Sequence, residues 1–110
     1  MSFAVSPGAV ADVSATSAAY DRKPDRYGAA FEAEVEIAFA RVAETPQLFS
    51  PVEDGVPGQE IREFFIERFQ QRVIYQVNGN DVLVLAVVHA SRRPGAWHRN
   101  LPTDPPAETT

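Results

Sequence analysis

The chain has 110 residues, 45% of them hydrophobic and 23% charged, which fits one globular domain with a single core. It contains no cysteine, which excludes disulfides and thiolate chemistry and favours a reducing cytoplasm. No apolar stretch approaches the roughly 20 residues of a membrane span, the first residues lack a secretory signal pattern, and the net charge of −5 argues against a general nucleic-acid coat protein.

Charge is unevenly distributed along the chain. Residues 1–58 carry nine acids and four bases (net −5), whereas residues 59–99 carry four acids and six bases (net +2). The six bases predict either a solvated sheet face or a basic surface for an acidic partner, protein or nucleic acid. All are arginines: Arg62, Arg68, Arg72, Arg92, Arg93 and Arg99.

The start of the chain predicts a short strand followed by a helix. Residues 3–5 are apolar and fit an edge strand, and Ser6 and Pro7 form an N-cap followed by proline at the first helical position. The helix is expected over residues 7–21, with Val10, Val13 and Tyr20 on roughly one side. Its many serines and alanines make it a weak helix alone, so we expect tertiary packing to stabilise it.

A second helix is expected between Pro24 and Glu44. Apolar side chains recur there at spacings of four and three, which places them on one buried stripe, while the acids lie on the opposite side. Two helices joined by a short link make an antiparallel hairpin. The stripe consists of Tyr27, Phe31, Val35, Ala38 and Val42.

The second half of the chain predicts a sheet. Residues 45–58 contain three prolines and two glycines and are expected to form a crossover loop. Three strands follow at residues 60–69, 72–77 and 82–88, the last two joined by an Asn-Gly hairpin turn. Together these elements predict an α+β fold, in which an N-terminal helical hairpin packs on a small, mostly antiparallel sheet. We expect residues 1–100 to form one domain and residues 101–110 a disordered, proline-rich acidic tail.

The segment after the last strand carries the most informative residues. Residues 82–88 are apolar on both faces, which is typical of a central strand covered on both sides. His89, Arg92, Arg93 and the only tryptophan, Trp97, follow. A buried strand does not require two adjacent arginines and a tryptophan beyond its end, so they either contact a partner or hold the tail against the sheet. Trp and Arg are enriched at binding hot spots, which favours contact.

A series of short sequence stretches follows in a characteristic order over residues 3–99. They are Ser6-Pro7, Tyr20, Phe31, Pro46-Gln47-Leu48-Phe49, Pro51-Val52, Ile61-Arg62-Glu63-Phe64, Arg68-Phe69, Arg72 to Val77, Val84 to His89, and Arg92-Arg93-Pro94-Gly95-Ala96-Trp97. Together they resemble the ParE/RelE superfamily of bacterial toxins from type II toxin–antitoxin pairs, and its ParE-like branch more than its RelE-like branch.

The resemblance implies one of two modes of action. RelE-like members are metal-independent ribonucleases that cut mRNA in the ribosomal A site, whereas ParE-like members bind and inhibit DNA gyrase. The nuclease mode would use Arg72, Arg93 and His89 here. However, the lysines expected on the first long strand are missing from residues 59–63, and Trp97 stands where an active tyrosine is expected. Indole offers no acid or base near neutral pH.

We therefore expect a toxin that acts by binding rather than as an enzyme, with DNA gyrase as the implied target and a cognate antitoxin as the neutralising partner. The alternatives are a RelE-like endoribonuclease acting on ribosome-bound mRNA and a non-toxic scaffold domain of the same fold. With two histidines and no cysteine, we expect no metal site, and also no cofactor, small-molecule substrate or membrane partner. The expected binding residues are Arg62, Arg68, Arg72, Arg92, Arg93 and Trp97.

Overall fold

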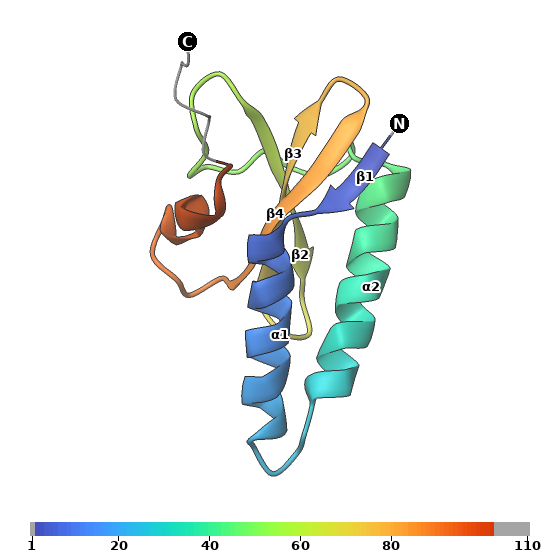
Figure 1. Cartoon of the computed structure of the whole chain (residues 1–110), viewed down its shortest axis with the longest axis vertical. Coiled ribbons are helices and arrows are strands. Elements are labelled where there is room, and N and C mark those ends of the chain that lie inside the picture. The colour runs from blue at the N-terminus through green and yellow to red at the C-terminus, as the bar shows by residue number, and fades with distance from the viewer. Residues whose placement is uncertain (1, 103–110) are drawn as a thin grey trace.

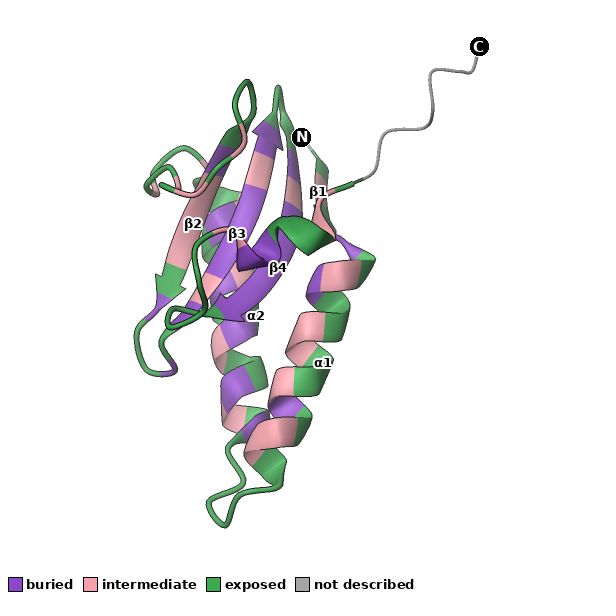
Figure 2. Cartoon of the chain, turned by 90° about the vertical axis from the view of Figure 1, so that its left-hand side faces the viewer, coloured by how far each residue is buried: buried purple, intermediate pink, exposed green. Residues whose placement is uncertain are grey.

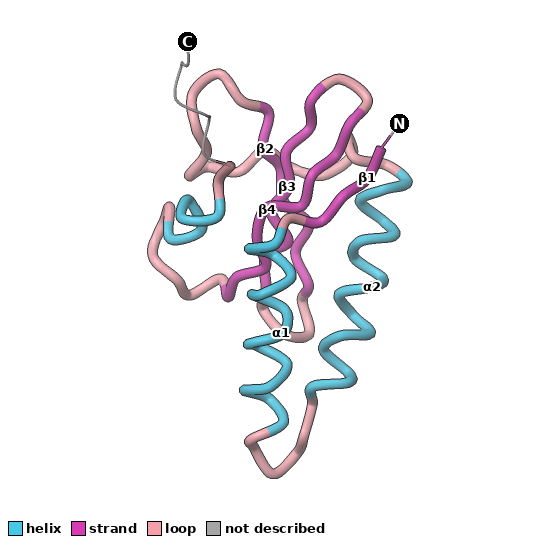
Figure 3. The backbone as a smooth tube through the Cα atoms, in the orientation of Figure 1, coloured by secondary structure: helices cyan, strands magenta, loops and turns pink. Residues whose placement is uncertain are grey.

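In the computed structural model, which describes residues 2–102, two helices pack on a four-stranded sheet (Figure 1). The strand order is β1-β4-β3-β2; β1 runs parallel to β4, and the other neighbours are antiparallel (Figure 3). The predicted α+β fold is confirmed. No helix within this part of the chain has the length and apolar character to cross a membrane. The elements are β1 (Ser2–Val5), α1 (Pro7–Asp21), α2 (Gly28–Glu44), β2 (Glu60–Ile66), β3 (Gln71–Asn78), β4 (Asp81–His89) and the 3₁₀ helix η1 (Ala96–Asn100).

Both helices begin at residues whose first N–H groups are capped. The Ser6 hydroxyl accepts a hydrogen bond from the N–H of Ala9 at 3.1 Å, as the Ser-Pro signal predicted. The N–H of Gly28 instead donates to the carboxylate of Asp21 at 3.0 Å, so the last residue of α1 caps α2. A Cβ at Gly28 would lie 2.5 Å from that carboxylate, so a larger residue there would displace the Asp21 side chain from its capping position.

The core under the helices is apolar and aromatic. The stripe of α2 is buried at Phe31, Val35, Ala38 and Val42, as its spacing predicted. The rings of Tyr20, Phe31 and Phe69 pack with centroid distances of 5.1–5.5 Å. The helices therefore cover one whole face of the sheet.

Three local predictions about packing and strand ends are wrong. Tyr27 is 45% exposed because α2 begins only at Gly28, which leaves the tyrosine in the turn before it. Val10 is 56% exposed because Ala9, Val13 and Tyr20 form the inward side of α1 instead, so only the Val13 and Tyr20 part of that prediction is correct. Strand β2 ends at Ile66 rather than at residue 69, since residues 67–70 form the turn to β3.

Strand β4 is buried on both faces, as predicted, but its side chains do not alternate regularly. Tyr75 pairs with Val84 and Ile74 with Ala86, so Leu85 is an extra residue and the register shifts there. This β-bulge reverses the alternation. Val82, Val84 and Val87 consequently face the helices, whereas Leu85, Ala86 and Val88 face the other side.

The second face of the sheet is covered by the chain that follows β4, together with Val52 and Val56 of the crossover loop. After His89 the chain turns outward, returns at Gly95 and lays η1 over the sheet (Figures 1 and 2). Trp97 is fully buried there among Ile61, Ile74, Leu85, Ala86 and Val88. Leu101 also packs against this cluster. The rest of the predicted tail, residues 103–110, lies outside the described residues.

Candidate functional site

The η1 segment is attached to the sheet by one carboxylate from the crossover loop, Asp54. Its Oδ2 accepts hydrogen bonds from the Gly95 N–H at 2.9 Å and from the Trp97 Nε1–H at 2.9 Å. The ring of His98 adds a third contact, because its Nε2 lies 2.7 Å from the Asp54 carbonyl oxygen and donates to it. The crossover loop and the end of the chain are thereby joined through a single residue.

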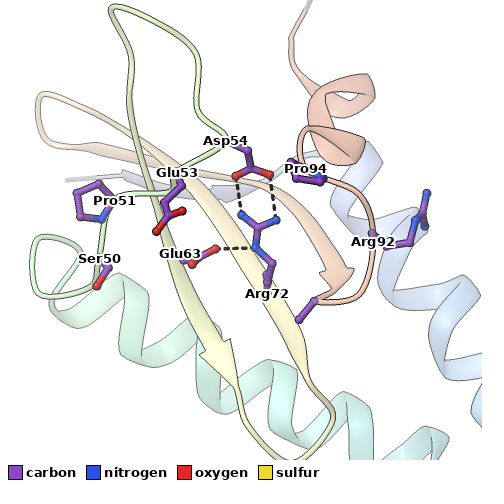
Figure 4. Close-up of a pocket in the computed structure, with 9 residues that line it drawn as sticks. Ser50, Pro51, Glu53, Asp54, Glu63, Arg72, Arg92 and Pro94 are labelled. Carbon is purple, nitrogen blue, oxygen red and sulfur yellow. Dashed lines mark hydrogen bonds and ion pairs between the residues drawn. The ribbon is translucent and has the colours of Figure 1, made fainter.

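The same carboxylate forms a bidentate ion pair with Arg72 of β3. Nη2 donates to Oδ1 at 2.7 Å and Nη1 to Oδ2 at 3.1 Å (Figure 4). The side chains of Arg72 and Asp54 are only 15% and 11% exposed, so the pair lies largely out of water. Planar two-point pairing is the strongest arrangement available to these groups.

Electrostatics reinforce this geometry. The hydrogen bonds from Arg72 hold the pKa of Asp54 well below its usual range, against the opposing effect of burial, and those from Gly95 and Trp97 act in the same direction. Hydrogen bonding to Asp54 in turn raises the pKa of Arg72, with a further contribution from Glu63. Both groups are therefore charged at every physiological pH.

Arg72 has a second carboxylate partner in Glu63 of β2. Its Nε donates to Glu63 Oε1 at 2.6 Å, as Figure 4 shows. One guanidinium is thus matched by two carboxylates. A substrate phosphate would have to displace at least one of them to reach Arg72.

A cleft of about 670 Å³ opens beside this pair. Its charged lining comprises three carboxylates, those of Glu53, Asp54 and Glu63, against the guanidinium groups of Arg72 and Arg92. With three acidic and two basic groups, the charged lining of the cleft is negative overall. Phosphate is an unfavourable occupant of such a site.

A second carboxylate, Asp12 of α1, holds the far end of η1. It accepts hydrogen bonds from Asn100 Nδ2 at 2.8 Å, from Arg99 Nη2 at 3.3 Å and from the Val87 N–H of β4 at 3.1 Å. Its side chain is 11% exposed. Asp54 and Asp12, which we call the two anchoring aspartates, therefore fix η1 from opposite ends.

Arg92 and Arg93 lie in the loop of residues 90–95 between β4 and η1, and both are exposed. Neither forms an ion pair with a carboxylate of residues 2–102. Figure 4 shows the Arg92 side chain directed away from the Arg72–Asp54 pair. Of the six predicted binding residues, these two are the ones left for an external partner.

The remaining predicted site residues are engaged within the chain. Arg62 donates to Glu60 at 2.8 Å and to the Phe49 carbonyl at 2.6 Å. Arg68 lies over the rings of Tyr27 and Phe69, 3.9 Å from Glu34. His89 is exposed, and its Nδ1 contacts Ser91.

Trp97 requires a correction. We expected it to contact a partner, but it is fully buried and its N–H is bonded to Asp54. Trp97 therefore has the other role that we considered, which is to hold the tail against the sheet.

The sequence patterns did not predict a structural role for either anchoring aspartate. Asp54 stands in a loop rich in proline and glycine, where an acid normally reads as a solvated turn residue. A signal was nevertheless present in the sequence, because the alternation along residues 72–77 places Arg72 on the same strand face as Ile74. An arginine on a covered face needs a carboxylate partner.

Within residues 2–102, no group of three histidine or acidic side chains is arranged to hold a metal ion. The arrangement as a whole contains a neutralised internal arginine, an acidic cleft and a rigid loop with two unpaired arginines.

The comparisons with known proteins agree with this fold. Residues 4–94 match the family model described as the ParE toxin of the type II toxin–antitoxin system parDE. A solved structure described as the chromosomal ParDE system from P. aeruginosa superposes with a TM-score of 0.61 at 25% identity, covering 81% of this chain and 95% of that chain. A search of curated proteins gives no match. Since the family model spans most of the sequence, the chain belongs to the ParE toxin family of type II toxin–antitoxin systems.

Proposed function

We propose that this ParE toxin inhibits a cytoplasmic target by binding to it, that the target is DNA gyrase, and that a cognate antitoxin neutralises it. The family membership supports the toxin role. The similarity to a structure described as a ParDE toxin–antitoxin system supports an antitoxin partner. Gyrase is the target that the ParE-like branch implies.

The observation that carries the binding mode is the state of Arg72. In a nuclease this strand arginine would face the scissile phosphate and stabilise its developing charge. Here it is bonded to Asp54 and Glu63 and lies in a mainly acidic cleft. Trp97, at the position of the expected catalytic tyrosine, is buried. Arg72 is therefore occupied by carboxylates rather than free for a phosphate, and the indole of Trp97 offers no acid or base for RNA cleavage.

The function is tested by inducing the chain in cells and assaying two activities separately. Purified chain is added to gyrase holoenzyme and relaxed plasmid, and supercoiling is measured; total mRNA from induced cells is examined for cleavage at ribosomal A sites. We expect supercoiling to be inhibited and mRNA to stay intact. Cleavage of mRNA that is abolished by Arg93→Ala would establish the nuclease alternative, and harmless induction would establish the scaffold alternative.

The antitoxin partner is tested by co-expression with the product of the adjacent reading frame. We expect growth to be restored and the two chains to purify together. Failure of both results would remove the antitoxin from the proposal without affecting the gyrase assay.

A further inference from the structure

We propose that Asp54 is a positioning residue, which holds the loop of residues 90–95 so that Arg92 and Arg93 form a preorganised contact surface for an acidic segment of a protein partner. The inference rests on the proposed binding function. It adds the surface that makes the contact and the residue that orients it.

The two arginines are left over after the chain's own carboxylates are used. The carboxylates that bind this part of the chain belong to the anchoring aspartates. The carboxylate of Asp54 accepts four hydrogen bonds and that of Asp12 accepts three. Neither contacts Arg92 or Arg93, and residues 90–100 contain no acid. The loop therefore presents two positive charges that a partner carboxylate can match with forked hydrogen bonds.

The loop that carries the arginines is fixed at both ends. At its start, the Ser91 N–H donates to His89 Nδ1 at 3.0 Å, and the Arg92 N–H donates to the His89 carbonyl at 3.0 Å. At its end, Gly95 adopts φ 79° and donates its N–H to Asp54 at 2.9 Å. A loop ordered before binding loses little conformational entropy in the complex, which favours affinity.

The charges around the loop favour an acidic protein segment over a nucleic acid. The adjoining cleft is lined by Glu53 and Glu63 in addition to Asp54, and the whole chain carries a net charge of −5. A continuous phosphate backbone would meet these acids, whereas a short segment with two or three carboxylates can contact the arginines alone.

The test is a double-mutant cycle on the full chain, with the product of the adjacent reading frame as the binding probe and gyrase holoenzyme as a second probe. Asp54→Asn is placed in the wild type and in an Arg92→Ala/Arg93→Ala background, and dissociation constants are measured by calorimetry. We expect Asp54→Asn to weaken binding about tenfold in the wild type and less than about twofold without the arginines, because it acts through them. Equal weakening in both backgrounds would overturn the proposal.

Asp12→Asn is the matched control, since it releases the other end of η1 without touching the loop. We expect it to lower the melting temperature while changing affinity by less than about twofold. A loss of affinity equal to that of Asp54→Asn would show that both aspartates act only through general stability, and would overturn the positioning role.

Gly95→Ala keeps the experiment informative if Asp54→Asn does not fold. A Cβ there meets the His98 ring at 3.5 Å, an ordinary contact, so the change strains only the φ angle and leaves the Arg72–Asp54 pair intact. We expect binding several-fold weaker, again only when both arginines are present.

Competition separates the remaining outcomes. A short single-stranded RNA or duplex DNA that displaces the protein probe, in a manner dependent on Arg92 and Arg93, would replace the acidic protein segment with a nucleic acid. If the wild type binds neither probe, the proposed function itself fails. If it binds and the cycle is additive, only the role of Asp54 fails.

Discussion

The two faces of the sheet are closed in different ways. Under the helices, apolar side chains from α1 and α2 meet those of β3 and β4, and burial is spread over many residues. On the opposite face a smaller cluster is covered by η1, which is held mainly by the two anchoring aspartates and by Trp97. The first face is thus closed mainly by apolar packing, whereas the second combines a smaller apolar cluster with a few charged hydrogen bonds.

The difference bears on the contact surface proposed for the second face. A face closed by apolar packing tolerates gradual changes in side-chain shape, whereas a segment held by charge-assisted hydrogen bonds adopts one defined geometry. The loop of Arg92 and Arg93 belongs to the second face. Its geometry can therefore be controlled by one residue, Asp54. Substituting that residue tests the difference between the two faces.

The largest expected effect is that of Asp54→Asn. The substitution keeps the size of the side chain but removes its charge and directs an NH₂ group at the donors of Arg72 or Gly95. Because Arg72 and Asp54 are largely buried, we expect the free energy of unfolding, measured in urea, to fall by about 3 kcal/mol. Glu53→Gln, at the exposed neighbouring carboxylate, is the control and should stay within about 0.5 kcal/mol. Similar stability of the two variants would mean that the second face does not depend on Asp54.

Trp97→Phe is expected to have the next largest effect. It keeps an aromatic ring in the cluster of Ile61, Ile74 and Leu85 but removes the N–H that donates to Asp54 and leaves part of the indole volume empty. We expect a loss of about 2 kcal/mol in urea denaturation. In the Asp54→Asn background the loss should be smaller, because the shared hydrogen bond is already weakened. Full additivity would contradict the contact as described.

The extent to which the sequence predicted these two faces follows from the kind of interaction in each. Periodicity reports apolar faces, so the stripe of α2, apart from Tyr27, and the twice-covered β4 were found correctly. It cannot report an ion pair between a loop residue and a strand residue 18 positions apart, as in Arg72 and Asp54. The buried position of Trp97 was missed because the side chains around it come from three different strands, and periodicity does not report such contacts. The bulge at Leu85 was also hidden, since a continuous apolar run looks the same with or without an extra residue.

Acid should open the second face before the first. The folded state holds the pKa of Asp54 below its unfolded value of about 3.9, so its stabilising contribution is complete above that pH and is lost as the pH falls below it. Trp97 is the only tryptophan and reports this face by fluorescence. We expect its emission to shift to the red below about pH 4 before the helical circular dichroism signal declines. In Asp54→Asn the separate fluorescence step should disappear; its persistence would assign the transition to another carboxylate.

The smallest effect is expected on the helix face, at Tyr75. Its buried hydroxyl donates to the Pro46 carbonyl at 2.6 Å and ties the crossover loop to the core. Tyr75→Phe keeps the ring and should cost about 1 kcal/mol in urea, since many apolar contacts around it remain. Burial raises the pKa of Tyr75 to about 12, so the unfolded chain ionises first, near pH 10, and this part of the stability falls as the pH rises from there towards 12. The phenylalanine variant should show a weaker alkaline decline than the wild type. An unchanged decline would place the responsible titration on another group and leave the helix face, as the comparison requires, insensitive to the loss of any one polar contact.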